Sequence, residues 1–341
     1  MQQKKKSCTT QQEETSVSQK KPFQLFDFFY KYGTILTIIV LIAVFTALNP
    51  AFISSDNLLN ILRSISIVTI IAVGVTVSLA VNGFDLSVGS SASLASAIVI
   101  SMFVWFSQNL AVALLAAFLG AIVIGLLNSI MIVKLKIPDM LATLAMMFII
   151  QGVALTYTKG ATISENMVMA DGSYAEGTIS PLFAKFGQLP WIIVIMLAVV
   201  LIAQGFLSLT KHGRFMYMIG GNQEAARLSG IPVNRYKVAA YLLSALLAAL
   251  GGIVLASRVM TAEINAGGPY LMDAVAAAFI GLSVLGAGKP NALGTFVGAV
   301  LIGILQNGLV MMSVPYYAMD IVKGSVLAFA LALTYYKQTH S

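Results

Sequence analysis

Long apolar runs separated by short polar stretches are the main pattern along this chain. A helix that crosses a bilayer needs about 20 mostly apolar residues. Clear runs of this kind lie at 33–54, 64–82, 140–158, 186–210, 238–257 and 291–312. We therefore predict that these six segments cross a membrane as helices.

Other apolar regions raise the predicted number of spans to ten. Residues 86–133 carry no charge and are too long for one helix, so they divide into two spans at the polar turn 107–109. Two weaker runs lie at 271–288 and 318–336. The chain is thus predicted to be an all-α, polytopic membrane protein with about ten transmembrane helices in one membrane domain, 33–337.

The basic residues predict how these spans are oriented, because Lys and Arg concentrate in cytoplasmic loops. With the N-terminus inside, fifteen of the twenty Lys and Arg residues fall on the inner side. The five that fall outside are Arg63, Lys159, Lys185, Arg258 and Lys323. An error of one span would invert every later loop and remove this asymmetry, so both termini are predicted to be cytoplasmic.

Three polar segments flank or connect the spans. Residues 1–32 are predicted to be a cytoplasmic tail with little order of its own. The connection 159–190 falls outside and carries acidic residues among Gly and Ser, which fits either an irregular cap or a docking surface for an external partner. The connection 211–236 falls inside.

Composition supports lipid as the solvent for this chain. The sequence is 58% hydrophobic and only 10% charged, whereas soluble domains carry about 25% charged residues. The net charge of +7 would be compatible with nucleic-acid binding. Here the basic residues are spread between apolar segments, which is typical of membrane topology and not of a nucleic-acid-binding face.

Residue types that carry catalysis or bind metals are scarce. The single cysteine, Cys8, lies in the polar tail, and the two histidines, His212 and His340, are far apart. We therefore expect no metal site, no bound cofactor and no Ser-His-Asp type catalysis. No segment matches the phosphate-binding pattern G-x-x-x-x-G-K-[ST], so the chain is not expected to hydrolyse ATP. An intramembrane enzyme is equally unsupported, which favours a transporter.

Two apolar segments resemble each other. Residues 120–128 (GAIVIGLLN) are similar to residues 298–306 (GAVLIGILQ). The predicted spans that hold them are five apart, so the copies would run in opposite directions, as in the inverted repeats of transporters. The alternative is that Gly-rich membrane helices resemble each other by composition alone.

The segment 82–89 interrupts the apolar pattern after the second span. Its candidate pathway or gate residues are Asn82, Gly83, Phe84, Asp85, Ser87 and Gly89. A carboxylate and two glycines here indicate an unwound or re-entrant backbone, which membrane depth allows only where protein or water satisfies it. The alternative is a cytoplasmic turn in which Asp85 caps the next helix.

A short helix is predicted inside the inner connection. Asn222 is a good N-cap and Glu224 lies in the first turn, where the helix dipole favours a negative charge. Gly230 suits the left-handed position after the helix, and Pro232 blocks its continuation.

An apolar stripe is expected on this helix. Ala225, Leu228 and Ile231 recur at intervals of three. The stripe could insert into a groove on a soluble partner, or it could lie on lipid headgroups, and the sequence leaves both open.

These motifs resemble one transporter family. The segments 83–89, 219–231 and 270–276 are similar to characteristic stretches of the ribose/xylose/arabinose-type permeases of ABC importers. The resemblance runs from about the second span to the C-terminus. It implies a ten-span permease in a bacterial plasma membrane, paired with a second permease chain of the same or a different kind.

The resemblance also implies roles and partners. An ATP-binding subunit would dock on a coupling element, and an external sugar-binding protein would deliver the substrate. The residues that would form the coupling element are Gly220, Gly221, Asn222, Glu224, Ala225, Ala226, Arg227, Leu228 and Gly230. Residues 83–89 would line or support the pathway near its inner end.

The substrate stays open at this point. Where the family often has Gly-Gly-Thr-Ser, this chain has Gly281-Leu-Ser283. The cargo could be a ribose-like pentose or related monosaccharide, a nucleoside or a furanose-like quorum signal. An ion-coupled secondary transporter is the remaining rival, although the acidic residues Glu263, Asp273 and Asp320 are expected at the outer ends of spans, away from the bilayer centre where a coupling ion would bind.

Overall fold

A computed structural model of the chain describes residues 25–169, 172–284, 288–315, 317–325 and 328, with 25–32 described through their backbone alone. Within these residues the regular secondary structure consists of helices. Two isolated β-bridges join Ile163 to Ala262 and Val168 to Tyr174. The helices are α1 (Leu25–Leu48), η1 (Pro50–Ile53), α2 (Ser55–Leu79), α3 (Val88–Val104), α4 (Leu110–Ser129), η2 (Ile130–Lys134), α5 (Asp139–Thr158), α6 (Pro181–Phe186), α7 (Trp191–Leu209), α8 (Lys211–Gly221), α9 (Gln223–Leu228), α10 (Val233–Val259), α11 (Gly268–Ser283) and α12 (Ala292–Met311).

The all-helical prediction is confirmed. Six helices in the described part of the chain are long and apolar enough to cross a bilayer: α2, α4 with η2, α5, α7, α10 and α12. Three shorter apolar helices are the part of α1 from Gly33, α3 and α11. Residues 317–325 are also helical, and most of the predicted span 318–336 lies outside the described residues. The first helix begins at Leu25, inside the segment predicted as a tail.

Short polar side chains fix where several helices begin. The side-chain oxygens of Asn109, Thr210, Asn222 and Asn291 each accept a hydrogen bond from a backbone N–H in the first turn of α4, α8, α9 and α12. Such caps satisfy N–H groups that the helix itself leaves unpaired. The predicted turn at 107–109 therefore does separate two helices.

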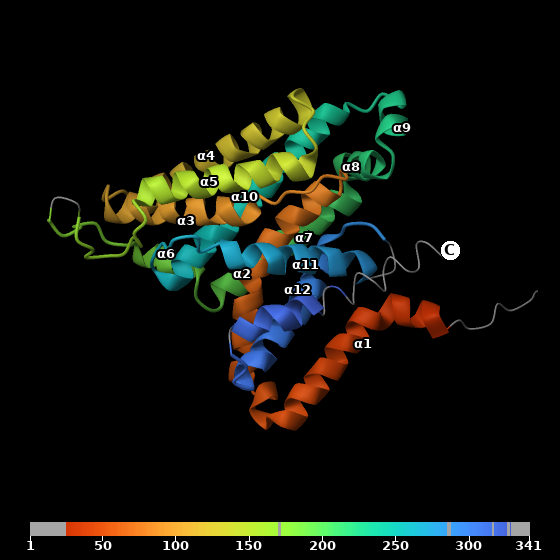
Figure 1. Ribbon diagram of the computed structural model, residues 1–341, viewed down its shortest axis with the longest axis horizontal. Helices are drawn as coiled ribbons and strands as arrows, with labels where there is room; N and C mark the ends of the chain where they lie inside the picture. The colour runs from red at the N-terminus through yellow and green to blue at the C-terminus, as the bar shows by residue number, and fades with distance from the viewer. Residues whose placement is uncertain (1–24, 170–171, 285–287, 316, 326–327, 329–341) are drawn as a thin grey trace, which may run out of the picture.

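The two long connections lie at opposite ends of the helix bundle. Helices α3, α4, α5 and α10 run side by side along the long axis (Figure 1). The start of α1 lies at the same end as α8 and α9, and α6 lies at the other end (Figure 1). We refer to these as the α9 end and the α6 end.

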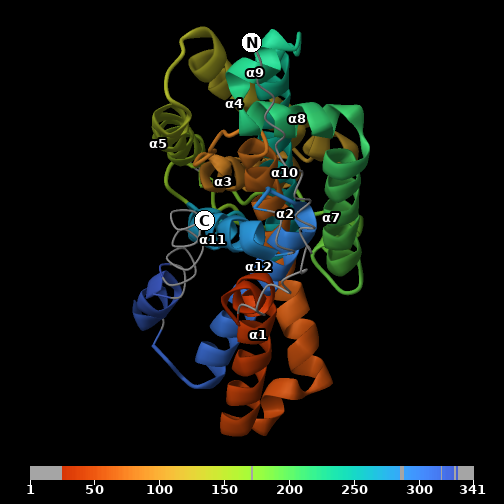
Figure 2. The same ribbon diagram turned by 90° about the vertical axis from the view of Figure 1, so that its right-hand side faces the viewer.

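Helices α2 and α10 form the centre of the molecule. Helix α2 packs against α7, α10, α11 and α12, and α10 packs against α2, α3 and α4. Their apolar windows are 67% and 61% buried, against 22% for α5 and 28% for α4 and α7. Figure 2 shows α5 and α7 on opposite flanks of this central pair. The outer helices thus offer apolar surface to lipid or to another chain.

Helices α2 and α10 both end in a turn back into the bundle. The backbone takes a left-handed conformation at Asn82 (φ 55°) and at Met260 (φ 59°). The non-helical segments 83–87 and 261–267 follow and lead to α3 and α11. Asp85 of the first segment accepts a hydrogen bond from Ser244 of α10, and the Gly267 N–H of the second segment donates to Ser93 Oγ of α3 (2.9 Å).

Candidate functional site

The first re-entrant segment is built around a fully buried carboxylate. Asp85 Oδ1 accepts hydrogen bonds from the Ser87 backbone N–H (2.9 Å) and from Ser87 Oγ (2.6 Å). Its Oδ2 accepts from Ser244 Oγ (2.8 Å), which lies near the middle of α10. Asn128 Nδ2 of α4 donates to Ser87 Oγ (2.9 Å). These donors offset the cost of burying the carboxylate and tie three elements together. We call Asp85, Ser87, Asn128 and Ser244 the Asp85 cluster.

Neighbouring residues of the segment are packed equally closely. Thr143 Oγ1 of α5 donates to the Phe84 carbonyl (3.0 Å). Tyr241 donates to Asp139 Oδ2 (2.7 Å), and a methyl group on Gly83 would lie 2.4 Å from the Tyr241 hydroxyl oxygen. Only glycine fits this approach.

The structure therefore places most of the predicted pathway residues in a tightly packed contact between the segment 83–87 and helices α4, α5 and α10. Gly83, Asp85, Ser87 and Gly89 are buried, Phe84 is half-buried and Asn82 is exposed. Asp85 does bond to a backbone N–H beside the start of α3, as a capping residue would, but it does so inside the bundle and not in a solvated turn. None of these residues faces the polar cavity described below.

The predicted inner helix forms as α9, and its cap is the expected one. Asn222 Oδ1 accepts from the Ala225 backbone N–H (2.9 Å), and Gly230 has a left-handed backbone (φ 80°). The predicted stripe of Ala225, Leu228 and Ile231 is wrong. Ile231 is buried, while Leu228 is 88% exposed. The helix ends at Leu228, so the periodicity that linked the three residues does not continue to Ile231.

The opposite face of α9 anchors it to the bundle. Ala226 is buried and packs in one cluster with Ile219 of α8, Val77 of α2 and Ile231. Glu224, Ala225, Arg227 and Leu228 point to solvent. Helix α9 thus presents one exposed leucine together with two exposed charged side chains.

Helix α8 touches the end of α2 by direct backbone contact. A methyl group on Gly220 would lie 2.5 Å from the Ala80 carbonyl oxygen, whereas one on Gly221 would meet nothing within 4 Å. The contact point immediately precedes the re-entrant segment 83–87. The two sequence motifs are therefore neighbours in space, which no local pattern in the sequence indicated.

A second contact holds α8 against the segment before α12. Tyr217 donates to the Pro290 carbonyl oxygen (2.6 Å), and burial raises the pKa of the Tyr217 phenol. The Tyr217 phenol therefore stays protonated at neutral pH and keeps donating this hydrogen bond.

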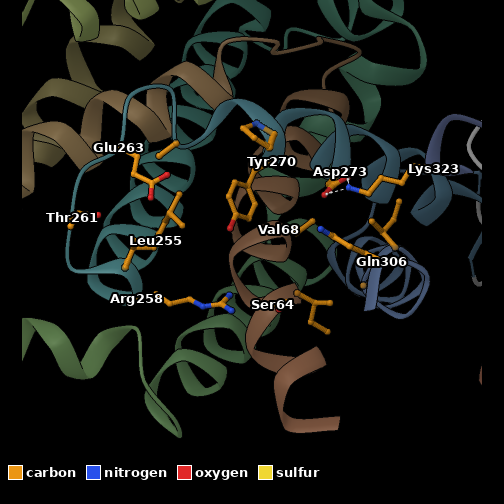
Figure 3. Close-up of a pocket in the computed structure, with 16 residues that line it drawn as sticks. Ser64, Val68, Leu255, Arg258, Thr261, Glu263, Tyr270, Asp273, Gln306 and Lys323 are labelled. Carbon is orange, nitrogen blue, oxygen red and sulfur yellow. Dashed lines mark hydrogen bonds and ion pairs between the residues drawn. The ribbon is translucent and has the colours of Figure 1, made fainter. Parts of the chain in front are cut away.

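A polar cavity of about 520 Å³ lies in the half of the bundle nearer the α6 end. Four charged residues, Arg258, Glu263, Asp273 and Lys323, line it together with Tyr270, Gln306, Ser64 and Thr261 (Figure 3). Lys323 Nζ lies 3.0 Å from Asp273 Oδ1. Two positive and two negative side chains leave the lining without net charge.

Sequence reasoning recognised these charges but not their arrangement. Glu263 was expected at the end of a span and is exposed, but Asp273 is only 7% exposed and pairs with Lys323 inside the bundle. The cavity residues come from α2, α10, the segment 261–267, α11, α12 and the helix at 317–325, so only the packing of these elements brings them together. Among the described residues no group of three or more His, Cys, Asp or Glu could hold a metal ion.

A bundle of bilayer-length apolar helices with a buried re-entrant segment and a polar cavity near one end is the architecture of a polytopic membrane protein. The chain belongs to the family described as "Branched-chain amino acid transport system / permease component", which matches residues 57–331.

Individual relatives match over nearly their whole length. The "Ribose import permease protein RbsC" of Escherichia coli (strain K12) is 37% identical over 310 residues, which cover 89% of this chain and 94% of the relative. RbsC of Haemophilus influenzae is 35% identical over 322 residues (93% and 97%). The "Xylose transport system permease protein XylH" of Escherichia coli (strain K12) is 29% identical over 351 residues (87% and 89%). No solved structure was found to match the chain.

Proposed function

We propose that this chain is the transmembrane permease subunit of an ATP-driven ABC importer, and that it carries a simple sugar across a bacterial plasma membrane. The observation that carries the proposal is the similarity to ribose import permeases along almost the full length of both chains. The weaker similarity to a xylose permease fits the same class of cargo, a pentose or a related monosaccharide. ATP is hydrolysed by a separate subunit.

The proposed topology has ten spans with both termini in the cytoplasm. Six long helices, three shorter apolar ones and the helix at 317–325 supply the spans. The α9 end is cytoplasmic and the α6 end is external, in agreement with the excess of basic residues on the inner side.

An inverted repeat relates α2–α5 to the elements from α10 onward. The similar segments 120–128 and 298–306 are 178 residues apart (120 to 298). The same separation joins Ser55 and Val233, the first residues of α2 and α10. A composition effect alone would not preserve one register over this length.

The re-entrant segments keep this register as well. Asn82 and Met260, the two left-handed turn residues, are 178 residues apart (82 to 260). Residues 85–89 (DLSVG) then align with 263–267 (EINAG), each with a carboxylate first and a glycine last.

Packing supports the same relation, because equivalent glycines meet the central helix of the other copy at positions that are one residue apart in this register. A methyl group on Gly125 of α4 would lie 2.9 Å from Leu242 Cα of α10, and one on Gly303 of α12 would lie 2.0 Å from Ile65 Cγ2 of α2. Helix α10 packs on α3 and α4 of the first copy, and α2 packs on α11 and α12 of the second. Each central helix thus packs against two helices of the other copy.

The partners follow from the exposed surfaces. The ATP-binding subunit binds α9 through Leu228 and Ala225, with Glu224 and Arg227 beside them. Its motion reaches the re-entrant segment through the contact of Gly220 with Ala80. A second permease chain, identical or not, covers apolar surface of the outer helices, and an external sugar-binding protein docks at the α6 end.

Reconstitution tests this function. Proteoliposomes that contain the chain, its ATP-binding subunit and its binding protein are expected to accumulate radiolabelled D-ribose only when ATP is present. Uptake that follows an ion gradient and ignores ATP would instead support an ion-coupled secondary transporter. Uptake of a nucleoside in place of ribose would keep the importer and change its cargo.

A further inference from the structure

The cavity at the α6 end has the chemistry of a site for a neutral polyol. In Figure 3 the side chains of Arg258, Glu263, Tyr270 and Gln306 lie around one space, with the Asp273–Lys323 pair at its edge. The balanced charges of this lining favour an uncharged ligand over an anion or a cation, because an ionic ligand would leave one charge unpaired.

The lining also matches hydroxyl groups, which both donate and accept hydrogen bonds. Arg258 supplies donors, Glu263 supplies acceptors, and the Gln306 amide supplies both. The Tyr270 ring offers an apolar face of the kind on which the C–H face of a sugar ring packs. The cavity volume of about 520 Å³ lies within the range of small-molecule sites.

Two of the polar groups at this cavity, apart from the Asp273–Lys323 pair, have no side-chain partner among the described residues. Within the described part of the chain, neither the Glu263 carboxylate nor the Gln306 amide makes a hydrogen bond or an ion pair with another side chain. Glu263 is exposed, and Gln306 is half-buried.

The equivalent groups of the first repeat differ, because they make hydrogen bonds with other side chains of the protein. In the proposed register Glu263 corresponds to Asp85, and Gln306 corresponds to Asn128. Asp85 is fully buried and bonded, and Asn128 donates to Ser87 of the same segment. The carboxylate of the first copy is thus bonded within the protein, although Asn128 Oδ1 has no partner among the described residues, while the carboxylate and amide of the second copy line a cavity.

We infer that the cavity is a substrate site for a neutral monosaccharide, with Glu263 and Gln306 as its main hydrogen-bonding residues and Tyr270 as its stacking residue. In the proposed repeat the Asp85 cluster is the counterpart of this site, and its carboxylate is bonded within the protein. The inference rests on the proposed sugar-importer function, and it assigns the place in the fold where the transported sugar binds.

Direct binding to the purified permease, without its ATP-binding subunit or binding protein, tests the inference. Saturation-transfer NMR with D-ribose as the probe is expected to detect binding to the wild-type chain and not to detect binding of D-ribonate, which carries a negative charge. Glu263→Ala and Gln306→Ala are each expected to weaken D-ribose binding by about tenfold or more, because each removes a hydrogen-bonding group. Asp56→Ala, which removes an exposed carboxylate outside the cavity, is the matched control and is expected to bind as wild type.

A labelling experiment reads the same site without relying on those variants. In a Cys8→Ser background, Ala266→Cys places a thiol on the cavity wall. D-ribose is expected to slow its reaction with a membrane-impermeant thiol reagent that is added from the external side. Labelling that is indifferent to D-ribose, or wild-type binding by both alanine variants, would overturn the assignment.

The outcomes separate this site from the overall function. If the reconstituted importer carries D-ribose with ATP while Glu263→Ala and Gln306→Ala bind and transport normally, the cavity assignment is wrong and the function stands. If no sugar is transported by the complete complex, the proposed function fails first.

Discussion

At the scale of single residues, glycines determine how closely backbones approach in this molecule. A methyl group on Gly252 of α10 would lie 2.1 Å from the Ala92 carbonyl of α3, and one on Gly298 of α12 would lie 2.2 Å from the Ala277 carbonyl of α11. Small residues are the usual means of close helix packing in lipid. The sequence shows that these helices are rich in glycine, but it does not show which glycine faces a neighbour.

The adjacent glycines Gly220 and Gly221 differ in whether they face a neighbouring backbone, and this difference allows a test. Gly220→Ala forces the added methyl group against the Ala80 carbonyl, a strain of about 1–3 kcal/mol. We expect about a tenfold or larger loss of ATP-driven uptake in proteoliposomes, because α8 can then no longer seat on the end of α2.

Gly221→Ala is the matched control, because its methyl group enters open space. It is expected to keep wild-type uptake, and both variants should still co-purify with the ATP-binding subunit through the exposed face of α9. Equal uptake by the two variants would argue against transmission through this contact.

The Asp85 cluster gives a second prediction at this scale. Asp85→Ala leaves the hydroxyls of Ser87 and Ser244 without their acceptor inside the bundle. We expect a loss of about 1–3 kcal/mol in the free energy of unfolding, measured by denaturation in detergent. Asp56→Ala, at an exposed position in the first turn of α2, should change it by no more than about 0.5 kcal/mol. A smaller loss for Asp85→Ala than for Asp56→Ala would show that the cluster does not stabilise the fold.

At the scale of elements, α9 shows what local sequence can and cannot predict. The cap at Asn222 and the left-handed turn at Gly230 follow from residue type, and both are present. The face that points outward depends on what the helix packs against. Ala226 turns inward because it meets α2 and α8, and this leaves Leu228 exposed. The spacing of Ala225, Leu228 and Ile231 could not reveal that the helix stops before Ile231.

Exposure of Leu228 yields the prediction for this element. Leu228→Asp should leave the free energy of unfolding within about 0.5 kcal/mol of wild type, because the side chain is 88% exposed. It should weaken association with the ATP-binding subunit by about tenfold or more, because a charge would enter an apolar contact. Co-purification and titration of the complex measure the effect. Gln223→Ala on the same helix is the control, and a matching loss there would point to general disruption of α9.

The double variant Glu224→Ala with Arg227→Ala probes the charged border of the same surface. It is expected to abolish uptake and to uncouple ATP hydrolysis from transport while the chain still inserts in the membrane. Both side chains are exposed, so no loss of packing accompanies their removal. Normal uptake by this variant would refute the assignment of α9 as the coupling element.

At the scale of the whole molecule, the sequence predicts the spans better than their assembly. Hydropathy is a local property, and five of the six clear apolar runs coincide with helices long and apolar enough to cross a bilayer. The sixth run, 33–54, falls on the shorter apolar part of α1. The cavity is lined by side chains as distant in sequence as Ser64 and Lys323. A single sequence carries no direct signal for such long-range proximity. The similarity of 120–128 to 298–306 is the exception, because the proposed repeat pairs Asp85 with Glu263 in the same register and so connects the Asp85 cluster with the cavity.

Orientation in the membrane is the property on which the proposed roles of both ends depend. Cys8 is the only cysteine, so Cys8→Ser provides a background for single thiols. In intact cells, Glu176→Cys is expected to react with an impermeant thiol reagent, since residue 176 is exposed in the connection that leads to α6. Leu228→Cys should react only after the cells are opened, because α9 lies at the opposite end of the bundle. Reaction of Leu228→Cys in intact cells would place α9 outside, where no ATP-binding subunit could reach it. The polar cavity would then lie in the cytoplasmic half of the bundle, away from an external binding protein.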